Sequence, residues 1–264
     1  APQDLQGFTH VVHTAARVHV MHGGNETEFM RGNAEVTARL AERAAAAGVR
    51  RFVFLSSIKV NGEATAGRPC RHDDPPAPAD AYARSKLAAE HALWQACRTS
   101  SLEGVVLRLP LVIGPGARAN VARLVRLVES GLPLPFGSIV NRRSLLTLGN
   151  LCDFVALALE HPRAADRVWL LCDGDDLSTA DLVRVIAAAL GRPARLWPCP
   201  AGVLRALGAA TGRSDEIARL TGSLMTFLQI GLGVGLGSRL ARVLPGEPQE
   251  GTPAPLPGWV LWVL

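Results

Sequence analysis

The chain has 264 residues, of which 48% are hydrophobic and 19% charged, an ordinary balance for a globular protein with a full core. This composition excludes a chain that is disordered throughout, a collagen-like chain and a small disulfide scaffold. The net charge of +5 comes from 28 basic and 23 acidic residues. Because the basic residues are scattered, they argue against a nucleic-acid-binding stripe and favour a site for an anionic small molecule.

The sequence indicates neither a membrane span nor a metal site. No apolar run reaches the roughly 18 residues that a membrane-spanning helix needs. The five cysteines are odd in number, form no CxxC pair and lack zinc-ligand spacing with histidine. We therefore expect reduced thiols in a cytoplasmic protein, with no metal.

Strands and helices are predicted to alternate from the beginning of the chain. A strand at 10–14 precedes a helix at 27–47, in which apolar side chains recur every three or four positions, and a buried strand follows at 51–57. Strand, helix and strand within about 45 residues are typical of a βαβ unit with a parallel sheet.

The alternation continues after a proline-rich loop at 61–80. Asp80 is placed to cap the next helix, and Ser178 with Asp181 resembles a capping box. The predicted elements are a helix at 81–97, a strand at 104–113, a helix at 121–130, a strand at 167–171 and a helix at 178–190. Residues 225–264 are rich in Gly, Leu and Pro, and we expect a flexible or poorly packed tail without a functional role.

The single tyrosine and one of the only two lysines lie four residues apart, at Tyr82 and Lys86. At the start of a helix these positions share one face, with Cβ atoms about 5–6 Å apart. An ammonium beside a phenol lowers the pKa of that phenol from about 10 and favours proton transfer at an alcohol or ketone. The alternative is a surface tyrosine with a lysine one turn away.

Ser56 and Ser57 end a predicted parallel strand at the edge where open α/β sheets bind their ligands. The Ser57 hydroxyl is placed to hydrogen-bond the same substrate oxygen that Tyr82 serves. Taken alone, Ser57 also fits an exposed serine at the end of a strand.

The serine at a strand end followed by Tyr-x-x-x-Lys resembles the extended short-chain dehydrogenase/reductase superfamily. Within it, the chain is most similar to the NAD-dependent nucleotide-sugar epimerase/dehydratase family, which includes the UDP-glucose 4-epimerases. The resemblance covers about residues 5–224. It rests on the segments 11–16, 33–37, 48–57, 106–110 and 114–116, and on 56–63, which looks like the branch acting on UDP-N-acetyl-sugars in surface-polysaccharide synthesis.

The resemblance implies a Rossmann-like, doubly wound parallel sheet with a smaller C-terminal substrate lobe. It implies that Tyr82 is the acid/base, that Lys86 binds the nicotinamide ribose and tunes Tyr82, and that Ser57 orients the sugar hydroxyl. It implies NAD as cofactor, with NADP as the alternative, and a homodimer formed by the helices at 27–47 and 81–97. The other implied cofactor-binding residues are Thr14, Ala15, Ala16, Asn33 and Pro110, and the substrate-binding residues are Asn120, Phe136 and Arg143 with Ser57.

The family's Gly-x-x-Gly-x-x-Gly loop is absent from this sequence, and we expect that about 60 residues carrying the first three strands would precede Ala1 in the full fold. The expected division is a partial dinucleotide-binding domain at 1–115, a substrate lobe at 116–224 with interleaved elements, and an atypical tail at 225–264.

The leading hypothesis is oxidation or reduction at C4 of a UDP-hexose or UDP-N-acetylhexose, by an epimerase or a 4-keto reductase. Two alternatives stay open: a reductase of hydroxysteroid- or flavonoid-type ketones, and an inactive, truncated dinucleotide-binding remnant. Arg143 and Asn120 favour the nucleotide sugar over an apolar ketone.

Overall fold

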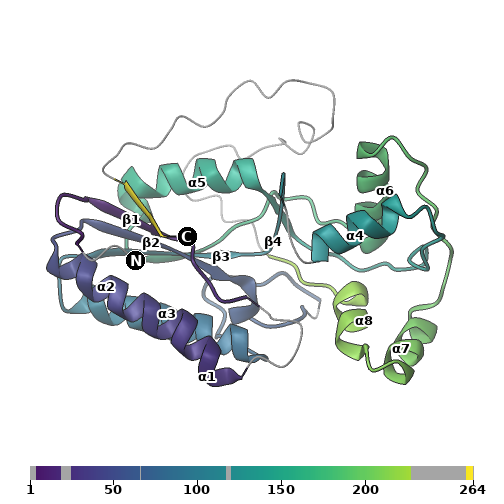
Figure 1. The fold of residues 1–264 in the computed structure, drawn as a ribbon, viewed down its shortest axis with the longest axis horizontal. Helices are drawn as coiled ribbons and strands as arrows, with labels where there is room; N and C mark the ends of the chain where they lie inside the picture. Colours follow the sequence, from purple (N-terminus) through teal and green to yellow (C-terminus); the bar gives the residue numbers. More distant parts are fainter. Residues whose placement is uncertain (1–3, 19–24, 66, 117–119, 227–259, 264) are drawn as a thin grey trace.

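The computed structural model describes residues 4–18, 25–65, 67–116, 120–226 and 260–263. Within these ranges the larger sheet has five strands, all parallel, in the order β6-β3-β2-β1-β7. Helices lie on both of its faces, so the predicted Rossmann-like parallel sheet is confirmed (Figure 1). The strands are β1 (His10–His13), β2 (Arg51–Ser57), β3 (Glu103–Leu109), β6 (Arg167–Leu170) and β7 (Val260–Val263).

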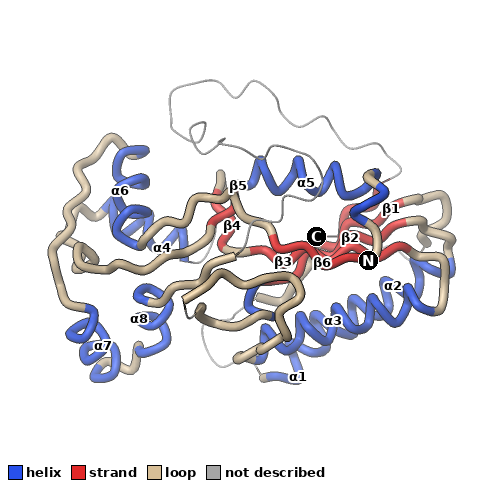
Figure 2. Tube along the Cα trace, turned by 180° about the vertical axis from the view of Figure 1, so that it is seen from behind, coloured by secondary structure: helices blue, strands red, loops and turns tan. Residues whose placement is uncertain are grey.

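Helices α2 (Val36–Ala46) and α3 (Ala81–Arg98) cover one face of the sheet, and α5 (Leu148–Glu160) covers the other (Figures 1 and 2). Side chains alternate along β2, because successive residues of a strand point to opposite faces. Phe52 and Phe54 pack on the side of α2 and α3. Val53 packs on the side of α5.

The helix predicted at 27–47 consists of three joined segments: α1 (Glu26–Phe29), a π-helical turn at Met30–Glu35, and α2. The hydroxyl of Thr37 donates to the Asn33 carbonyl at 2.7 Å. Such a bond from threonine to the backbone four residues earlier competes with the α-helical ladder. The wider turn thus falls at Asn33, a predicted site residue, and π-helical turns are frequent at functional sites.

The strand predicted at 104–113 is two strands in two sheets. Pro110 lacks an N–H and cannot continue the ladder, so β3 ends at Leu109 and β4 (Leu111–Ile113) pairs instead with β5 (Leu145–Thr147). The buried Pro110 therefore marks where the chain leaves the large sheet.

The part of the chain expected to form the substrate lobe, called the lobe from here on, has its own hydrophobic core, which includes Leu124, Phe136, Ile186 and Leu204. The predicted capping box of Ser178 and Asp181 is confirmed at the start of α6. Because β6 and α5 return to the large sheet, the two parts of the chain are interleaved, with the large sheet and the lobe side by side in Figure 1. The lobe helices are α4 (Asn120–Glu129), α6 (Thr179–Ala189), α7 (Ala201–Ala210) and α8 (Ser214–Thr221).

Arg51 is a charged residue in the first position of β2, yet only 1% of it is exposed. Its guanidinium donates to the carbonyls of Ala158, Leu159 and His161 at 2.9–3.0 Å, and pairs with Glu103 at 2.7 Å. It thereby satisfies carbonyls at the C-terminal end of α5, which a helix leaves without internal partners. Arg51 joins the sheet to the helix on its far face.

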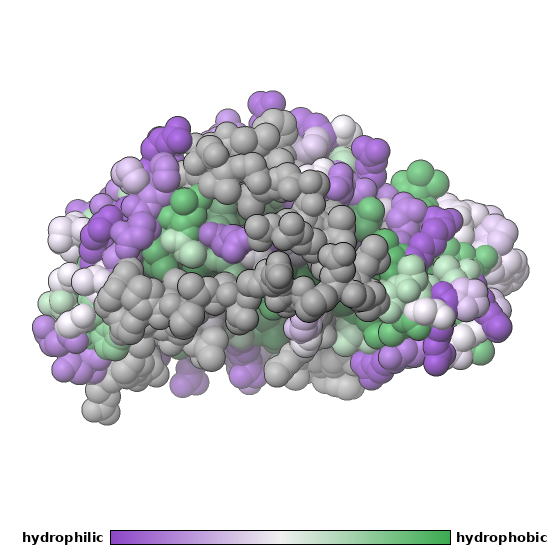
Figure 3. Space-filling view, turned by 90° about the horizontal axis from the view of Figure 1, so that it is seen from above, coloured by the Kyte–Doolittle hydropathy of each residue, from purple (hydrophilic) through white to green (hydrophobic). Residues whose placement is uncertain are grey.

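The end of the expected tail contains a strand, since β7 pairs with β1 along Val260–Val263. The glycine-rich segment at 231–237 lies outside the described residues. Within the described part, no helix is both long and apolar enough to cross a membrane. On the face shown in Figure 3, hydrophilic residues are spread around the outline rather than gathered in one patch.

Gly104, in β3, faces α3 so closely that an added Cβ would lie 2.6 Å from the Trp94 ring and 2.9 Å from Cys97 Sγ. We expect Gly104→Ala to destabilise the fold by about 1–3 kcal/mol, because overpacking forces the helix and strand apart. Gly149→Ala is the control, since nothing lies within 4 Å of its Cβ position in α5. Denaturant midpoints would measure both, and equal stability of the two variants would contradict the packing.

Candidate active site

Ser57 and Tyr82 meet where the carboxyl end of β2 approaches the first turn of α3. The two side chains lie close enough for the Ser57 hydroxyl to affect the pKa of the Tyr82 phenol. Ser57 is buried, and Tyr82 is half-buried with its ring edge-on to Phe29 at 6.3 Å between centroids. Asp80 caps the helix by accepting from the N–H of Ala83 at 2.7 Å, as its position predicts. The two hydroxyls expected to act on one substrate oxygen are thus side by side.

Burial raises the pKa of Tyr82 above its ordinary value, the Ser57 hydroxyl opposes that rise, and the Asp80 carboxylate adds to it. The expectation that Lys86 brings the pKa of Tyr82 down is therefore wrong for this structure, in which the causes of the shift are burial, Ser57 and Asp80. The loss of water around the phenol outweighs other effects, and the Lys86 ammonium is directed elsewhere.

Lys86 is 1% exposed, and its Nζ donates to the carbonyl of Leu55 at 2.7 Å. The same nitrogen lies 4.1 Å from the centroid of the Phe54 ring, a cation–π contact. Burial lowers the pKa of Lys86 to about 7, against the opposing charge of Glu90. Lys86 thus differs from a surface lysine, whose ammonium keeps its water.

The second lysine also belongs to the site, which the sequence reasoning missed. Lys59 lies two residues after Ser57, and its Nζ pairs with Asp80 at 2.5 Å and Glu63 at 2.6 Å. Burial alone would raise the pKa of Asp80, but the Lys59 ammonium and the helix N–H more than offset it, so the pKa is lowered. A signal was available in the sequence, because Lys59 precedes the acidic Glu63 by four residues.

Arg143 comes from the lobe and is half-buried. Its Nη1 donates to the carbonyl of Arg219. Burial lowers the pKa of Arg143, the charge of Glu63 opposes that effect, and the charge of Arg219 adds to it.

The predicted cofactor-binding residues Thr14, Ala15 and Ala16 follow directly after β1 and are half-buried. His13, the last residue of β1, pairs with Phe54, so these three residues lie at the same edge of the sheet as Ser57. Pro110 follows β3 at this edge, where Leu109 pairs with Ser57. Because Ala15 and Ala16 have small side chains, they add little side-chain volume beside the strand ends.

Asn33 is 2% exposed and connects the loop after β1 to helix α3. Its Oδ1 accepts from the N–H of Arg17 at 2.7 Å, and its Nδ2 donates to the Arg17 carbonyl at 3.1 Å and to Ser85 Oγ at 2.8 Å. Ser85 in turn donates to the carbonyl of Tyr82 at 2.7 Å. The side chain therefore positions the loop and the first turn of α3.

One predicted substrate residue, Phe136, is not brought to the Ser57–Tyr82 pair, and another, Asn120, is described only by its backbone. Phe136 is 6% exposed and packs in the core of the lobe. Asn120 begins α4, and its side chain lies outside the described structure. Their roles stay predictions. Among the described residues, no group of three or more His, Cys, Asp or Glu could hold a metal ion.

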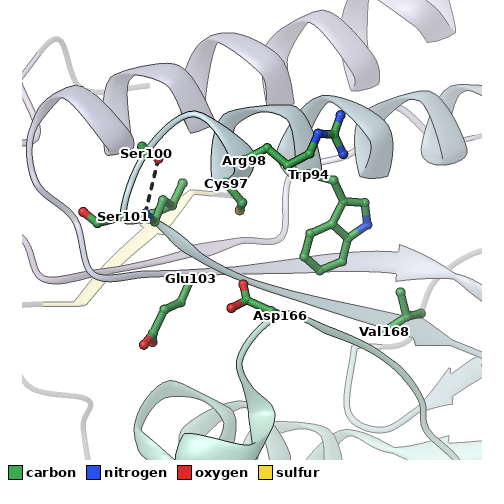
Figure 4. Close-up of a pocket in the computed structure, with 9 residues that line it drawn as sticks. Trp94, Cys97, Arg98, Ser100, Ser101, Glu103, Asp166 and Val168 are labelled. Atoms are coloured by element: carbon green, nitrogen blue, oxygen red, sulfur yellow. Dashed lines mark hydrogen bonds between the residues drawn. The ribbon is translucent and has the colours of Figure 1, made fainter.

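A surface pocket of about 600 Å³ lies at the opposite end of the strands (Figure 4). It opens where β3 and β6 begin and α3 ends, whereas Ser57 and Tyr82 lie where β2 ends and α3 begins. Open α/β sheets bind ligands at the carboxyl ends of their strands, so this pocket is not the candidate site. Its lining includes Trp94, Cys97, Arg98, Ser100, Ser101, Leu102, Glu103, Asp166 and Val168.

Comparison with known proteins identifies the family of this chain. The NAD dependent epimerase/dehydratase family matches residues 2–172. The chain belongs to this family. A UDP-glucose 4-epimerase of Vibrio cholerae is 46% identical over 225 residues, which cover 83% of this chain and 69% of the relative. The predicted family membership is confirmed.

Solved structures agree with the fold and the family. MoeE5 in complex with UDP-glucose and NAD has a TM-score of 0.71 at 25% identity, over 91% of this chain and 78% of that one. The Thermus thermophilus UDP-glucose 4-epimerase complex with NAD has a TM-score of 0.62 at 27% identity, over 73% of this chain and 65% of that one. The chain thus spans about two thirds to four fifths of these relatives' lengths.

The lone tyrosine allows its hydroxyl to be titrated directly by tyrosinate absorbance. We expect the midpoint to lie above about 10, the ordinary value, since burial disfavours the phenolate. Ser57→Ala should raise it further, because the variant loses the hydroxyl that favours the charged form. Ser138→Ala, at an exposed serine of the lobe, is the control; an unchanged or lowered midpoint in Ser57→Ala would contradict the contact.

Proposed function

We propose that this protein is an NAD-dependent nucleotide-sugar 4-epimerase acting on a UDP-hexose of the UDP-glucose class. The observation that carries the proposal is the proximity of Ser57 and Tyr82 at the carboxyl edge of β2, with a buried lysine one helical turn beyond Tyr82. The 46% identity to the Vibrio cholerae UDP-glucose 4-epimerase supports this substrate over other nucleotide sugars.

Tyr82 is the acid/base of the proposed reaction. For this step Tyr82 must enter the reaction as the phenolate, against the effect of burial on its pKa. Its oxygen then takes the proton of the C4 hydroxyl as the sugar is oxidised and returns a proton when the ketone is reduced. Ser57 hydrogen-bonds that substrate oxygen and orients it toward Tyr82. Because Tyr82 is half-buried, bulk water competes poorly for the proton.

The residues at the ends of β1, β2 and β3 suit a dinucleotide. Ala15 and Ala16 offer backbone approach without side-chain bulk, Pro110 forms an apolar wall, and Asn33 holds the loop in place. The ammonium of Lys86 has three N–H donors, so one can remain on the Leu55 carbonyl while others bind ribose hydroxyls. When bound, NAD accepts and returns the hydride of C4; NADP is the alternative.

Arg143 is proposed to bind the diphosphate of the substrate. A guanidinium pairs its planar fork with two phosphate oxygens, and the half-buried position of Arg143 strengthens such a pair. The charge of Glu63, in the loop that follows Ser57, acts on the Arg143 guanidinium, which supports a place for it on the side of the candidate site. An apolar ketone, the alternative substrate, has no group for this charge to bind.

We also propose how the protein assembles and where it is located. We propose a homodimer through the outer surfaces of α2 and α3, which pack against each other and leave residues such as Glu42, His91 and Gln95 exposed. A cytoplasmic location accords with the free thiols of the five cysteines.

Tyr82→Phe should lower the rate of conversion of UDP-glucose to its C4 epimer about 10²–10⁴-fold, because it removes the proton-transfer group and little volume. The variant should still bind NAD, which can be monitored by the quenching of tryptophan fluorescence. Ser101→Ala, in the pocket at the opposite end of the strands, is the control.

Two results would sink this proposal. Wild-type-like activity of Tyr82→Phe would remove the proposed acid/base. A wild-type protein that binds no NAD and converts no UDP-hexose or UDP-N-acetylhexose would favour the inactive remnant.

Arg143→Ala should raise KM for the UDP-sugar about tenfold or more while changing kcat less, because the diphosphate contact is the same in the ground and transition states. Arg142→Ala is the matched control, since its neighbouring guanidinium is exposed. Initial rates over a range of UDP-glucose concentrations measure both. Equal KM values for the two variants would place the diphosphate elsewhere.

A further inference from the structure

Glu90 and Arg108 form an ion pair buried beneath the candidate site. Arg108 Nη2 lies 2.7 Å from Glu90 Oε2, and Arg108 Nε lies 3.1 Å from Oε1. The side chain of Arg108 is only 5% exposed and that of Glu90 only 2%. Burying two charges is costly even when they pair, and a buried pair is weak evidence of stability alone. The position of the pair next to the end of β2 and to Lys86 indicates a further role.

The pair holds both sides of Ser57 through hydrogen bonds. The hydroxyl of Ser56, directly before Ser57, donates to Glu90 Oε1 at 2.5 Å. Arg108 Nη1 donates to Asn61 Oδ1 at 3.1 Å, just beyond the short helix that Ser57 caps. The end of β2, the following turn, α3 and β3 are therefore fixed to one another at this point.

Glu90 also lies one helical turn beyond Lys86, which is itself one turn beyond Tyr82. Positions four apart share a helix face. Burial lowers the pKa of Lys86 to about 7, and Glu90 is the charged group that opposes this effect. Glu90 is thus placed by the helix to support the positive charge of Lys86.

Other titratable or charged groups near Lys86 come from each element packed around it. Tyr82 lies on α3, Arg108 on β3, and His13 on β1, where its ring stacks on Phe54 at 5.4 Å between centroids. His13 Nε2 is 3.1 Å from Thr37 Oγ1. Asp80 and Lys59 pair with each other at the start of the helix.

We propose that Glu90 and Arg108 are positioning residues of the proposed active site: together they hold Ser57 in place and keep the Lys86 ammonium charged. The proposal rests on the proposed function for its catalytic meaning. It assigns Glu90 the role of supporting the positive charge, and Arg108 the role of limiting that support by partial neutralisation of the carboxylate.

Opposite effects of the two substitutions distinguish this role from structural support. Glu90→Gln removes the carboxylate and leaves the Arg108 charge unpaired, so Lys86 should lose its proton about one pH unit lower or more. Arg108→Met leaves Glu90 unpaired beside Lys86, so the proton should be lost at higher pH. In the double variant the midpoint should lie between those of Glu90→Gln and wild type. A merely structural pair would give both single variants the same change.

The chain's two lysines make the measurement direct. NMR titration of the full chain with isotope-labelled lysine gives two side-chain signals, and Lys59→Arg identifies which is which. The Lys59 signal is the internal reference. The expected order of Lys86 midpoints is Glu90→Gln, double variant, wild type, Arg108→Met. His13→Asn, which removes the other nearby titrating ring, should preserve that order.

Shifts of the same sign in both single variants, or no shift in either, would overturn the proposal. If a single variant fails to fold, the double variant still tests it, because a midpoint at or above that of wild type contradicts the role of Glu90. In the active enzyme, the alkaline limb of kcat should follow the same order. An inactive wild type would refute the proposed function, while the lysine titration would still decide the role of the pair.

Discussion

The candidate site depends on charged side chains that are buried away from water near the carboxyl end of a parallel sheet. Helix α3 lays Lys86 and Glu90 against β2 and β3, where each is about 1% exposed. A buried charge without a partner costs several kcal/mol, so each must be satisfied by a group at a definite place. Lys86 uses the Leu55 carbonyl and Glu90 uses Arg108. These requirements fix α3 against the sheet, and with it the Tyr82 hydroxyl beside Ser57.

The same burial sets the electrostatics of the candidate site. It raises the pKa of Tyr82 and lowers that of Lys86, so both move toward their neutral forms. Helix spacing brings Cβ atoms within reach, but it does not decide where an ammonium points. In this structure the lysine is directed to a backbone carbonyl, so the attraction expected from the Tyr-x-x-x-Lys spacing is not what governs the phenol.

Local signals in the sequence predicted much of the fold. The βαβ order, the Asp80 cap and the Ser178 capping box all depend on residues within a few positions of one another, and all are confirmed. The pairing of Ser57 with Tyr82 followed from the rule that strand ends in parallel sheets carry the ligands. The break at Pro110 was visible in the sequence but was outweighed by the apolar run around it.

What could not be predicted depends on contacts between distant segments. The partner of the Lys86 ammonium lies 31 residues away, and Asn33 bonds to Ser85 across 52 residues. Phe136 was expected at the substrate, but the lobe core that surrounds it is assembled from α4, α6 and α7. The position of Lys59 required knowing that the loop after β2 returns to the start of α3.

Arg51 has a consequence for how the protein is made. Its guanidinium is buried, and four of its bonds are to residues more than 50 positions later, three of them at 158–161. Until residues 158–161 have been synthesised, Arg51 in β2 lacks the carbonyl acceptors that satisfy its charge when it is buried. The sheet can close over Arg51 only after α5 has emerged, so synthesis through about residue 161 separates a loosely collapsed nascent chain from a folded one.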